Sequence, residues 1–433
     1  MLTSQKEKAY SLLKQYKKDA YIFGPGVFPQ VATHTANIGA KALVISNNSG
    51  WLEPYTQQLL AILKSNNIIL AGNSITPGAK PNTPLADVYR IGTYILHLQP
   101  DSLIALGSGS TIDAVKAANV LGCLGGYSPD IETYFGTGKV TDALSKSGFK
   151  LLPMLAIETA ASSGAHLTKY SNVTDLTSQQ KKLIVDEAIV PTYALFDYDL
   201  TASTPRDLLL DGAFDGIAHC LEVFYGANET NYQLLRDIAL TGTELIIKGL
   251  LDYKSTEINN SSIREMIGLG TDLGGYAIMV GGTSGPHLTS FSLVDLTSHG
   301  RACAVMLPYY TMFFAPAIKE QLQDILPLLQ KYDLIDTKGQ NGADMGPIEA
   351  AHYVAKGLLN LKRLVGFPVK LNDLTSFDPS YIDKITTAAK NPQLEMKLKN
   401  MPVPLSSAQV EEYMRPILQA AADGDLALIK HLN

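Results

Sequence analysis

The order of apolar segments along the chain restricts its fold more than any other feature. Up to about residue 200, short apolar runs alternate with stretches of helical spacing, and the runs cover 42–46, 67–71, 102–106 and 151–157. Such alternation predicts a mostly parallel sheet with helices on both faces. Beyond this point strand signals nearly vanish, while apolar residues at helical spacing recur, as over 348–365. The sequence therefore predicts an α/β N-terminal domain, residues 1–202, and an all-α C-terminal domain, residues 203–433.

A glycine-serine turn links the third apolar run to the helix expected after it. Residues 105–116 read A-L-G-S-G-S-T-I-D-A-V-K, and the helix is expected from about Thr111 to Asn119. Glycines permit a sharp turn and a close backbone approach, and hydroxyl side chains can cap the helix. A strand, a glycine turn and a helix N-terminus together can hold a pyrophosphate, although an ordinary strand-to-helix turn has the same pattern. The residues expected to contribute are Gly107, Ser108, Gly109, Ser110 and, in the first turn, Asp113.

One carboxylate and three imidazoles in the C-terminal part are candidate metal ligands. Asp215 and His219 are four residues apart, so on a helix they share one face. His287 and His299 follow farther along the chain. Such a mixed set suits Fe(II) or Zn(II) rather than Ca or Mg. The spacing of the first pair alone is common, so the upstream glycine turn is what strengthens this interpretation.

Together these motifs resemble the iron-containing (group III) alcohol dehydrogenase family of the dehydroquinate synthase-like superfamily. The segments that carry the resemblance span most of the chain and include 21–26, 39–46, 107–116, 159–168, 181–201 and the four candidate ligands. The resemblance implies a Rossmann-like dinucleotide-binding domain and a helical domain that binds metal and substrate. It places Asp215, His219, His287 and His299 on the metal-ligating, catalytic positions of the family. Further cofactor-binding positions that it implies are Asn47, Thr159, Ser162, Ser163, Thr168 and Lys181.

Three positions depart from the family pattern. Asn47 follows the second strand, where family members often carry an aspartate for the adenosine ribose. Without that carboxylate, the 2′-phosphate of NADP is not repelled. No arginine adjoins Asn47 in the sequence to favour this phosphate, so the choice between NAD and NADP stays open. Phe291 stands where many members carry a histidine, which removes one proton relay. His166 replaces a glutamate in the serine-rich loop, either lining the nicotinamide pocket or serving as a satisfied loop histidine.

The composition is the one expected of a soluble enzyme. The chain has 433 residues, with 35 basic and 41 acidic side chains, so neither nucleic acid nor a membrane surface is an expected partner. The leading residues lack an apolar signal core, and no run of eighteen or more apolar residues occurs. The three widely spaced cysteines suit a reducing cytoplasm and are interpreted as small core residues: Cys123, Cys220 and Cys303.

The resemblance implies an NAD(P)-dependent alcohol dehydrogenase or aldehyde reductase that uses iron, with zinc as the alternative metal. Its expected substrate is a small alcohol or aldehyde, its expected location is the cytoplasm, and a homo-oligomer is compatible with the sequence. Two other classes stay open. A dehydroquinate synthase-like lyase would need several basic side chains for a polyanionic substrate, yet residues 260–310 offer mainly Arg264 and Arg301. A non-catalytic relative acting as a binding module would be expected to lose metal ligands, and all four are present.

Overall fold

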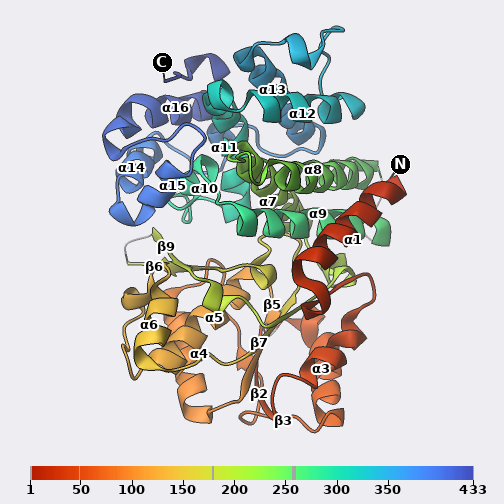
Figure 1. The fold of residues 1–433 in the computed structure, drawn as a ribbon, viewed down its shortest axis with the longest axis vertical. Helices are drawn as coiled ribbons and strands as arrows, with labels where there is room; N and C mark the ends of the chain where they lie inside the picture. The colour runs from red at the N-terminus through yellow and green to blue at the C-terminus, as the bar shows by residue number, and fades with distance from the viewer. Residues whose placement is uncertain (1, 48, 178–179, 256–259, 433) are drawn as a thin grey trace. The chain divides into compact units, whose positions relative to one another are not determined.

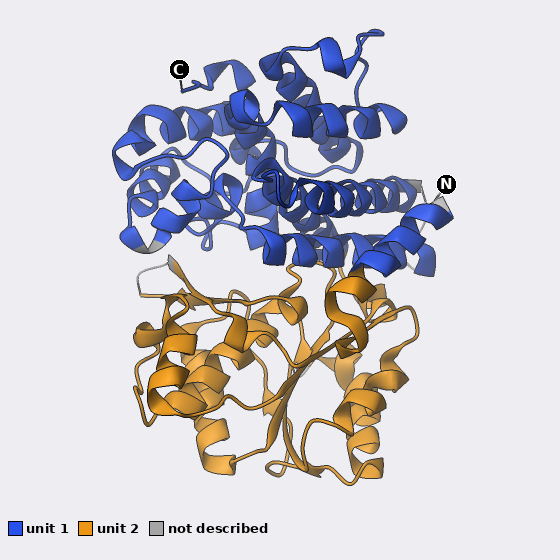
Figure 2. Cartoon of the chain, in the orientation of Figure 1, with its two compact units in different colours: residues 1–12, 206–433 blue, residues 13–205 orange. Residues whose placement is uncertain are grey.

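The protein forms two compact units. The computed structural model describes residues 2–47, 49–177, 180–255 and 260–432. One unit comprises residues 13–205, orange in Figure 2, and the other comprises residues 1–12 and 206–433, blue in Figure 2. The division predicted from the sequence lay between residues 202 and 203 and assigned residues 1–12 to the α/β part.

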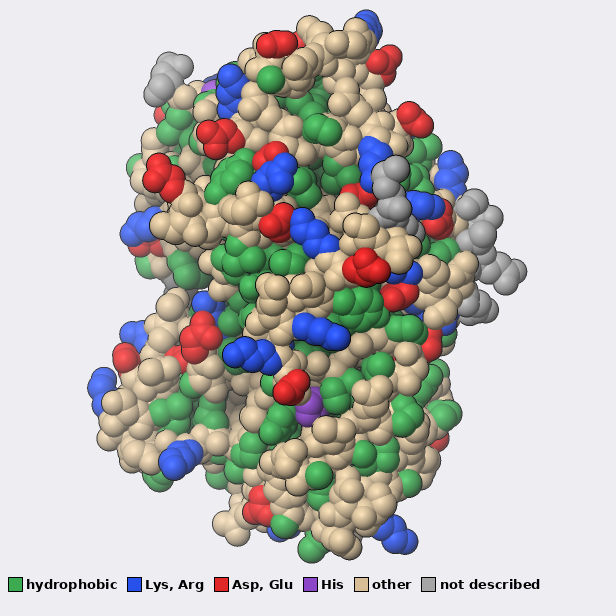
Figure 3. Space-filling view, turned by 45° about the vertical axis from the view of Figure 1, so that its right-hand side comes forward, with side chains coloured by type: hydrophobic (Ala, Val, Ile, Leu, Met, Phe, Trp, Pro, Cys, Tyr) green, Lys and Arg blue, Asp and Glu red, His purple; other side chains and the backbone are tan. Residues whose placement is uncertain are grey.

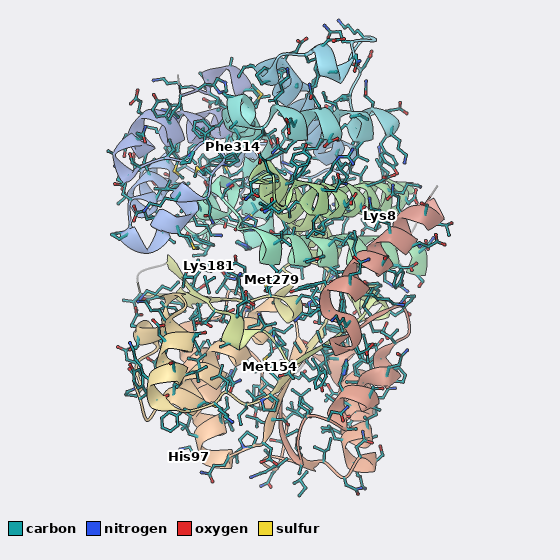
Figure 4. The ribbon with its side chains drawn as sticks, viewed as in Figure 1. Lys8, His97, Met154, Lys181, Met279 and Phe314 are labelled. Atoms are coloured by element: carbon teal, nitrogen blue, oxygen red, sulfur yellow. The ribbon has the colours of Figure 1, made fainter. Side chains whose placement is uncertain are left out.

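The leading helix α1 (Leu2–Lys17) explains why the first residues group with the helical unit. Lys6 Nζ lies 2.5 Å from Glu265 Oε2, and Lys8 Nζ, labelled in Figure 4, lies 2.6 Å from Asp237 Oδ1. Both acidic partners belong to the helices that follow residue 206. These ion pairs join segments more than 200 positions apart, which periodicity along the sequence does not reveal.

The α/β unit contains a seven-stranded sheet in which every pairing is parallel. The order is β1-β10-β7-β5-β2-β3, with β4 also paired to β2. Figure 1 labels β7, β5, β2 and β3 of this sheet. The strands are β1 Tyr21–Gly24, β2 Lys41–Ser46, β3 Ile69–Leu70, β4 Thr76–Pro77, β5 Ser102–Gly107, β7 Met154–Glu158 and β10 Tyr193–Asp197. The predicted Rossmann-like parallel sheet is therefore confirmed, although the strand expected over 67–71 is reduced to two residues at the sheet edge.

Helices cover both faces of this sheet, as the alternation predicted. Along β2, Leu43 and Ile45 face one apolar core, while Ala42 and Val44 face the other. The period of two reflects side chains that point alternately to opposite faces of a strand. The helices of this unit are α2 Val31–Thr35, α3 Glu53–Ser65, α4 Leu85–Leu98, α5 Gly109–Leu124 and α6 Lys139–Ser147.

A small second sheet in the same unit was not predicted. It consists of β6 (Gly136–Thr137), β8 (Tyr170–Asp175) and β9 (Gln180–Val185), in the order β6-β9-β8, and β8 pairs with β9 antiparallel. Its strands contain many polar residues and therefore lack the apolar runs that marked the main sheet. Lys181, labelled in Figure 4, belongs to β9.

The described residues of the second unit after 205 contain helices and connections but no strand, which confirms the predicted helical C-terminal part. Residues 348–365 were expected to form a helix, and α13 does so before Gly366 takes the left-handed conformation at φ +67°. The helices are α7 Arg206–Tyr225, α8 Tyr232–Ser255, α9 Ser261–Val280, α10 Gly285–Ser290, α11 His299–Phe314, α12 Lys319–Lys331, α13 Pro347–Leu364, α14 Ser380–Ala389, α15 Glu395–Lys399 and α16 Arg415–Asp423.

Glycines allow α7, α8 and α9 to pack with their backbones in close approach. A Cβ added to Gly216 on α7 would lie 2.8 Å from Thr271 Cγ2 on α9. A Cβ on Gly274 would lie 3.0 Å from His219 Cβ, and one on Gly270 would lie 2.8 Å from the carbonyl oxygen of Gly242. Any larger residue at these positions would push the helices apart, so this packing fixes where α7 carries its polar side chains.

On the face drawn in Figure 3, basic and acidic side chains are interspersed, in agreement with the near-balanced composition. Across the described residues, every helix is too short or too polar to traverse a bilayer.

Candidate metal and cofactor sites

The structure brings together the four side chains that were predicted from the sequence to be metal ligands. Asp215 and His219 lie one turn apart on α7, His287 lies on α10, and His299 begins α11. Asp215 Oδ1 is 3.9 Å from His219 Nε2 and 3.7 Å from His287 Nε2. The ring centroids of His287 and His299 are 5.2 Å apart.

These distances suit donor atoms that surround one ion. The two distances from Asp215 Oδ1 to the imidazole nitrogens are too long for hydrogen bonds. They are slightly longer than the spacing of about 3.4 Å expected between donor atoms that each lie about 2.1 Å from a tetrahedral ion. Asp215, His219 and His287 are each less than 5% exposed. A buried carboxylate beside three imidazoles is a donor set that matches Fe(II) or Zn(II), so the residues fit a divalent metal.

Two further side chains orient the imidazoles. Glu222 Oε1 lies 2.6 Å from His287 Nδ1, and Glu222 Oε2 accepts a hydrogen bond from the Ser284 backbone N–H. Ser290 Oγ lies 2.9 Å from His299 Nδ1. With Nδ1 engaged in both rings, Nε2 is the nitrogen that can bind a metal. Glu222 was not predicted as a site residue, although it lies three residues after His219 and therefore on the same face of α7.

His219 is oriented by packing. Its Nδ1 is buried and makes no hydrogen bond to the described residues, while its ring stacks on His287 with centroids 4.7 Å apart. Burial lowers the pKa of His219 to about 4. The ring is therefore neutral at pH 7, which is the form that binds metals.

A buried acid and a buried base lie beside the cluster. Burial raises the pKa of Glu222 and lowers the pKa of Lys397, because both charged forms are removed from water. Lys397, on α15, donates to the side chain of Thr283, and its ammonium lies 6.0 Å from the ring centroid of Phe291. Phe291 in turn lies parallel to His299 at a centroid distance of 6.2 Å. Neither Lys397 nor Glu222 belongs to any of the motifs recognised in the sequence.

Cys303 is buried, as predicted for a core thiol, and its sulfur also faces the cluster. Ligand atoms of four residues lie within 4.8 Å of one another, and they come from Asp215, His287, His299 and Cys303. His219 is not one of these four residues, but its Nε2 lies 3.9 Å from Asp215 Oδ1 and its ring stacks on that of His287. The interpretation of Cys220 as a buried core thiol is consistent with its position, since its side chain lies against Gly242 of α8.

The glycine-serine turn joins β5 to α5 as expected, but its details differ. The helix begins at Gly109 and ends at Leu124, so it is longer at both ends than the expected span. Ser108 occupies the N-cap without a side-chain capping bond, and Ser110 Oγ instead accepts from the Asn82 backbone N–H. The proposed capping role of these hydroxyls is therefore wrong.

Gly109 is needed for a close approach rather than for an unusual backbone angle. Neither Gly107 nor Gly109 has a positive φ. A Cβ on Gly109 would overlap the Ser163 hydroxyl, and one on Gly107 would lie 2.8 Å from Thr111 Cβ. The serine-rich loop thus lies directly against the N-terminus of α5, which brings two of the proposed cofactor-binding segments together.

Asp113 and Lys116 brace the surrounding loops. Asp113 Oδ2 accepts from the backbone and side-chain N–H groups of Asn172 at 3.0 and 3.1 Å. Lys116 Nζ donates to three backbone carbonyls, those of Ala165, Thr168 and Tyr170. These partners give Asp113 a structural role within the unit, so its place among the cofactor-binding residues rests on the family resemblance alone.

His166 is enclosed in the α/β unit. Its Nε2 lies 3.0 Å from the Tyr21 hydroxyl, and its Nδ1 lies 3.3 Å from Glu158 Oε2. The ring is 1% exposed, so of the two interpretations of this residue the satisfied loop histidine describes its surroundings. The same carboxylate, through Oε1, accepts from the backbone N–H groups of Thr159 and Ala160.

The remaining proposed cofactor residues lie around the same turn. Ser162 is half-buried in the serine-rich loop, Thr168 is buried where that loop ends, and Lys181 interacts electrostatically with Asp113. Asn47 follows β2 and lies close to Gly78. A Cβ added to Gly78 would overlap the side-chain oxygen of Asn47. The guanidinium of Arg90 donates to the Gly78 carbonyl at 2.7 Å. An arginine therefore lies near Asn47 in space, although none adjoins it in sequence.

Family models match both parts of the chain. The model for iron-containing alcohol dehydrogenase matches residues 19–198, and the model for the C-terminal region of the Fe-containing alcohol dehydrogenase family matches residues 209–418. A similar protein is the NAD-dependent methanol dehydrogenase of Bacillus methanolicus, 24% identical over 352 residues, covering 81% of this chain and 86% of the relative. Lactaldehyde reductase of Escherichia coli is 25% identical over 304 residues, covering 70% of this chain and 74% of the relative.

Solved structures share the fold. An alcohol dehydrogenase from Oenococcus oeni superposes with a TM-score of 0.76 at 20% identity, covering 93% of this chain and 98% of the other. A 1,3-propanediol oxidoreductase also gives 0.76, at 21% identity and the same coverage. Since the two family models together match well over half of its residues, the chain belongs to the iron-containing alcohol dehydrogenase family.

Proposed function

We propose that the protein is a metal-dependent, NAD(P)-linked alcohol dehydrogenase that also reduces the corresponding aldehydes. The observation that carries this proposal is the cluster of buried Asp215, His219 and His287 with half-buried His299, contributed by three helices. Family membership supports the reaction class, and the relatives named above are dehydrogenases and a reductase for small alcohols and aldehydes. The proposed metal is iron, as in the family name, with zinc as the alternative.

Each side chain of the cluster has a role in this proposal. The three imidazoles and Asp215 hold the ion, and Glu222 fixes the tautomer of His287. When bound, the divalent ion supplies positive charge that stabilises an alkoxide, and the nicotinamide gives or accepts the hydride. Phe291 cannot accept a proton, so proton exchange at this site must involve other groups; a bound cofactor would offer its ribose hydroxyls for this role, together with water.

The nucleotide is assigned to the turn at the start of α5. The backbone N–H groups of residues 107–110 and the helix dipole favour a pyrophosphate there. Asn47 carries no negative charge, so NADP is expected to bind as well as NAD. The arginines that a lyase acting on a polyanionic substrate would need are already engaged or buried, since Arg301 pairs with Asp211 at 2.7 Å and Arg264 is 8% exposed. This favours the dehydrogenase over the lyase.

The test is to measure bound metal and cofactor reduction together. Protein purified without oxygen would be assayed for iron and zinc and then offered a panel of short alcohols with NAD or NADP. His219→Ala should lose both metal and turnover while its circular dichroism stays unchanged. His34→Ala is the matched control, because His34 is equally buried but stacks on Tyr193 in the α/β unit. Full metal occupancy in His219→Ala would refute this ligand assignment.

A further inference from the structure

Cys303 lies one turn after His299 on α11 and is fully buried. Its Sγ lies 3.8 Å from His299 Nε2 and 3.9 Å from His299 Nδ1. Its sulfur also belongs to the four ligand atoms within 4.8 Å of one another. The thiol is therefore a neighbour of the proposed metal ligands in space as well as in sequence.

The start of α11 is held firmly against α7. A Cβ on Gly300 would lie 2.5 Å from the carbonyl oxygen of Asp211 and 3.0 Å from Asp215 Cβ. Gly300 thus lets the first turn of α11 approach the turn of α7 that carries Asp215. Since positions four apart on a helix share a face, Cys303 is directed to the same side as His299.

The other two thiols have different surroundings. Cys220 follows His219 directly, but its Sγ lies against Gly242 and 4.0 Å from the Gly270 carbonyl oxygen, on the side of α8 and α9. Cys123 lies in the α/β unit, with its Sγ 3.2 Å from the Asn119 side chain. Neither belongs to the cluster of ligand atoms, so each provides a control for Cys303.

A buried cation also lies within electrostatic range of Cys303. The charge of Lys397 interacts with both Cys303 and Glu222. Cys303 therefore lies close to imidazole and carboxylate donors and within electrostatic range of a buried amine.

We propose that Cys303 is a further ligand of the divalent ion and that its sulfur biases the site towards zinc. On binding, the S–H bond breaks, its proton passes to water, and Sγ shares its electron pair with the ion, with no change of oxidation state. Thiolate is a soft ligand that favours zinc over iron(II), whereas a site of imidazole and carboxylate alone suits both metals. This inference rests on the proposed metal site and adds a donor to it.

Cobalt(II) tests the metal site and the Cys303 ligand separately. Bound cobalt reports the metal site, whereas a near-ultraviolet charge-transfer band reports thiolate coordination, because imidazole and carboxylate ligands do not give that band. Metal-free protein would be titrated with cobalt, and both bound cobalt and absorption would be recorded. We expect one ion per chain with the thiolate band, which Cys303→Ser abolishes while cobalt still binds. The band should persist in Cys220→Ala and in Cys123→Ser.

The double variant Cys123→Ser/Cys220→Ala keeps Cys303 as the sole cysteine of the chain, so the assignment does not depend on the folding of Cys303→Ser. A thiolate band in that variant supports the proposal. Stoichiometric cobalt without the band, or a band that survives in Cys303→Ser, overturns it and leaves the proposed metal site intact. If wild-type protein binds no cobalt, the metal site itself is refuted.

Metal preference provides a second readout. Metal-free protein would be equilibrated with competing zinc and iron(II) without oxygen, and the bound metals would be quantified. Cys303→Ser should lower the zinc-to-iron ratio by roughly tenfold or more, on the scale of changes seen when groups around a metal are removed. A ratio that stays equal to that of wild type would overturn the proposed bias.

Discussion

Glu222 Oε1 lies 2.6 Å from His287 Nδ1, and both side chains are buried beside the proposed metal site. The carboxylate holds the ring so that Nε2 faces Asp215. Glu222→Gln keeps the shape but removes the charge that strengthens this bond, so metal affinity should fall about 10–100-fold. Competition with a chelator measures this change. Glu244→Gln on α8, whose carboxylate instead accepts from Gln5 and Tyr332, should leave the affinity unchanged.

Substitution at Gly109 has two separable effects. Gly109→Ala should weaken cofactor binding, both by crowding the pyrophosphate and by clashing with the Ser163 hydroxyl. Ser163→Gly relieves the second effect, so Gly109→Ala/Ser163→Gly should regain thermal stability while its cofactor affinity stays below that of Ser163→Gly alone, which controls for the loss of the Ser163 side chain. Fluorescence titration with NADH and NADPH measures the affinity. Full recovery of affinity in the double variant would show that Gly109 serves packing alone.

Charge at position 47 should set the cofactor preference. Asn47→Asp places a carboxylate beside Gly78, where it would repel a 2′-phosphate, so the ratio of NADP to NAD affinity should fall roughly tenfold, or about 1.4 kcal/mol. Arg90→Gln is the companion variant, since Arg90 binds the Gly78 carbonyl. It should weaken NADP more than NAD. If wild-type protein already rejects NADP strongly, the phosphate is excluded by something other than charge at this position.

Proton transfer should not depend on His166. Because its ring is buried between Tyr21 and Glu158, His166→Ala should lower thermal stability but change turnover less than about tenfold. Tyr21→Phe is the matched control, since it removes one hydrogen bond and keeps the ring. Phe291→His adds a proton acceptor beside His299 and should raise turnover. A loss of roughly a hundredfold in His166→Ala, with metal and cofactor still bound, would identify it as the relay.

Stability should rise with pH because of Lys362 on α13. Burial lowers its pKa from 10.5 to about 7, and its ammonium donates to the Ala304 carbonyl. Between pH 7 and 10.5, Lys362 is protonated in the unfolded chain but not in the folded chain. The free energy of unfolding therefore increases with pH, by about 2 kcal/mol from pH 7 to 9. Urea unfolding of Lys362→Met should lack this rise, whereas Lys356→Met, on the exposed face of α13, should retain it.

The parts that sequence could predict are those with a local pattern. Apolar runs marked the strands of the main sheet, and the four-residue spacing placed Asp215 and His219 on one helix face. The β8–β9 pair was missed because its alternation of buried and half-buried residues includes few apolar side chains. Glu222 and Lys397 were missed because their role depends on partners from other helices. The proximity of Arg90 to Asn47 likewise arises only when separate segments fold together, whereas the four-residue spacing of His299 and Cys303 is a local pattern that the sequence analysis did not use.

The glycine contacts among α7, α8 and α9 separate the framework of the site from its lining. His219 is located by main-chain packing against Gly274, whereas Phe291 and Lys397 reach the site from a short helix end and from α15. Exchanging these lining side chains therefore leaves the backbone beneath the metal ligands in place. A laboratory evolution campaign aimed at new alcohols has room to vary the lining, while Gly216, Gly270 and Gly274 are the positions that such libraries should leave untouched.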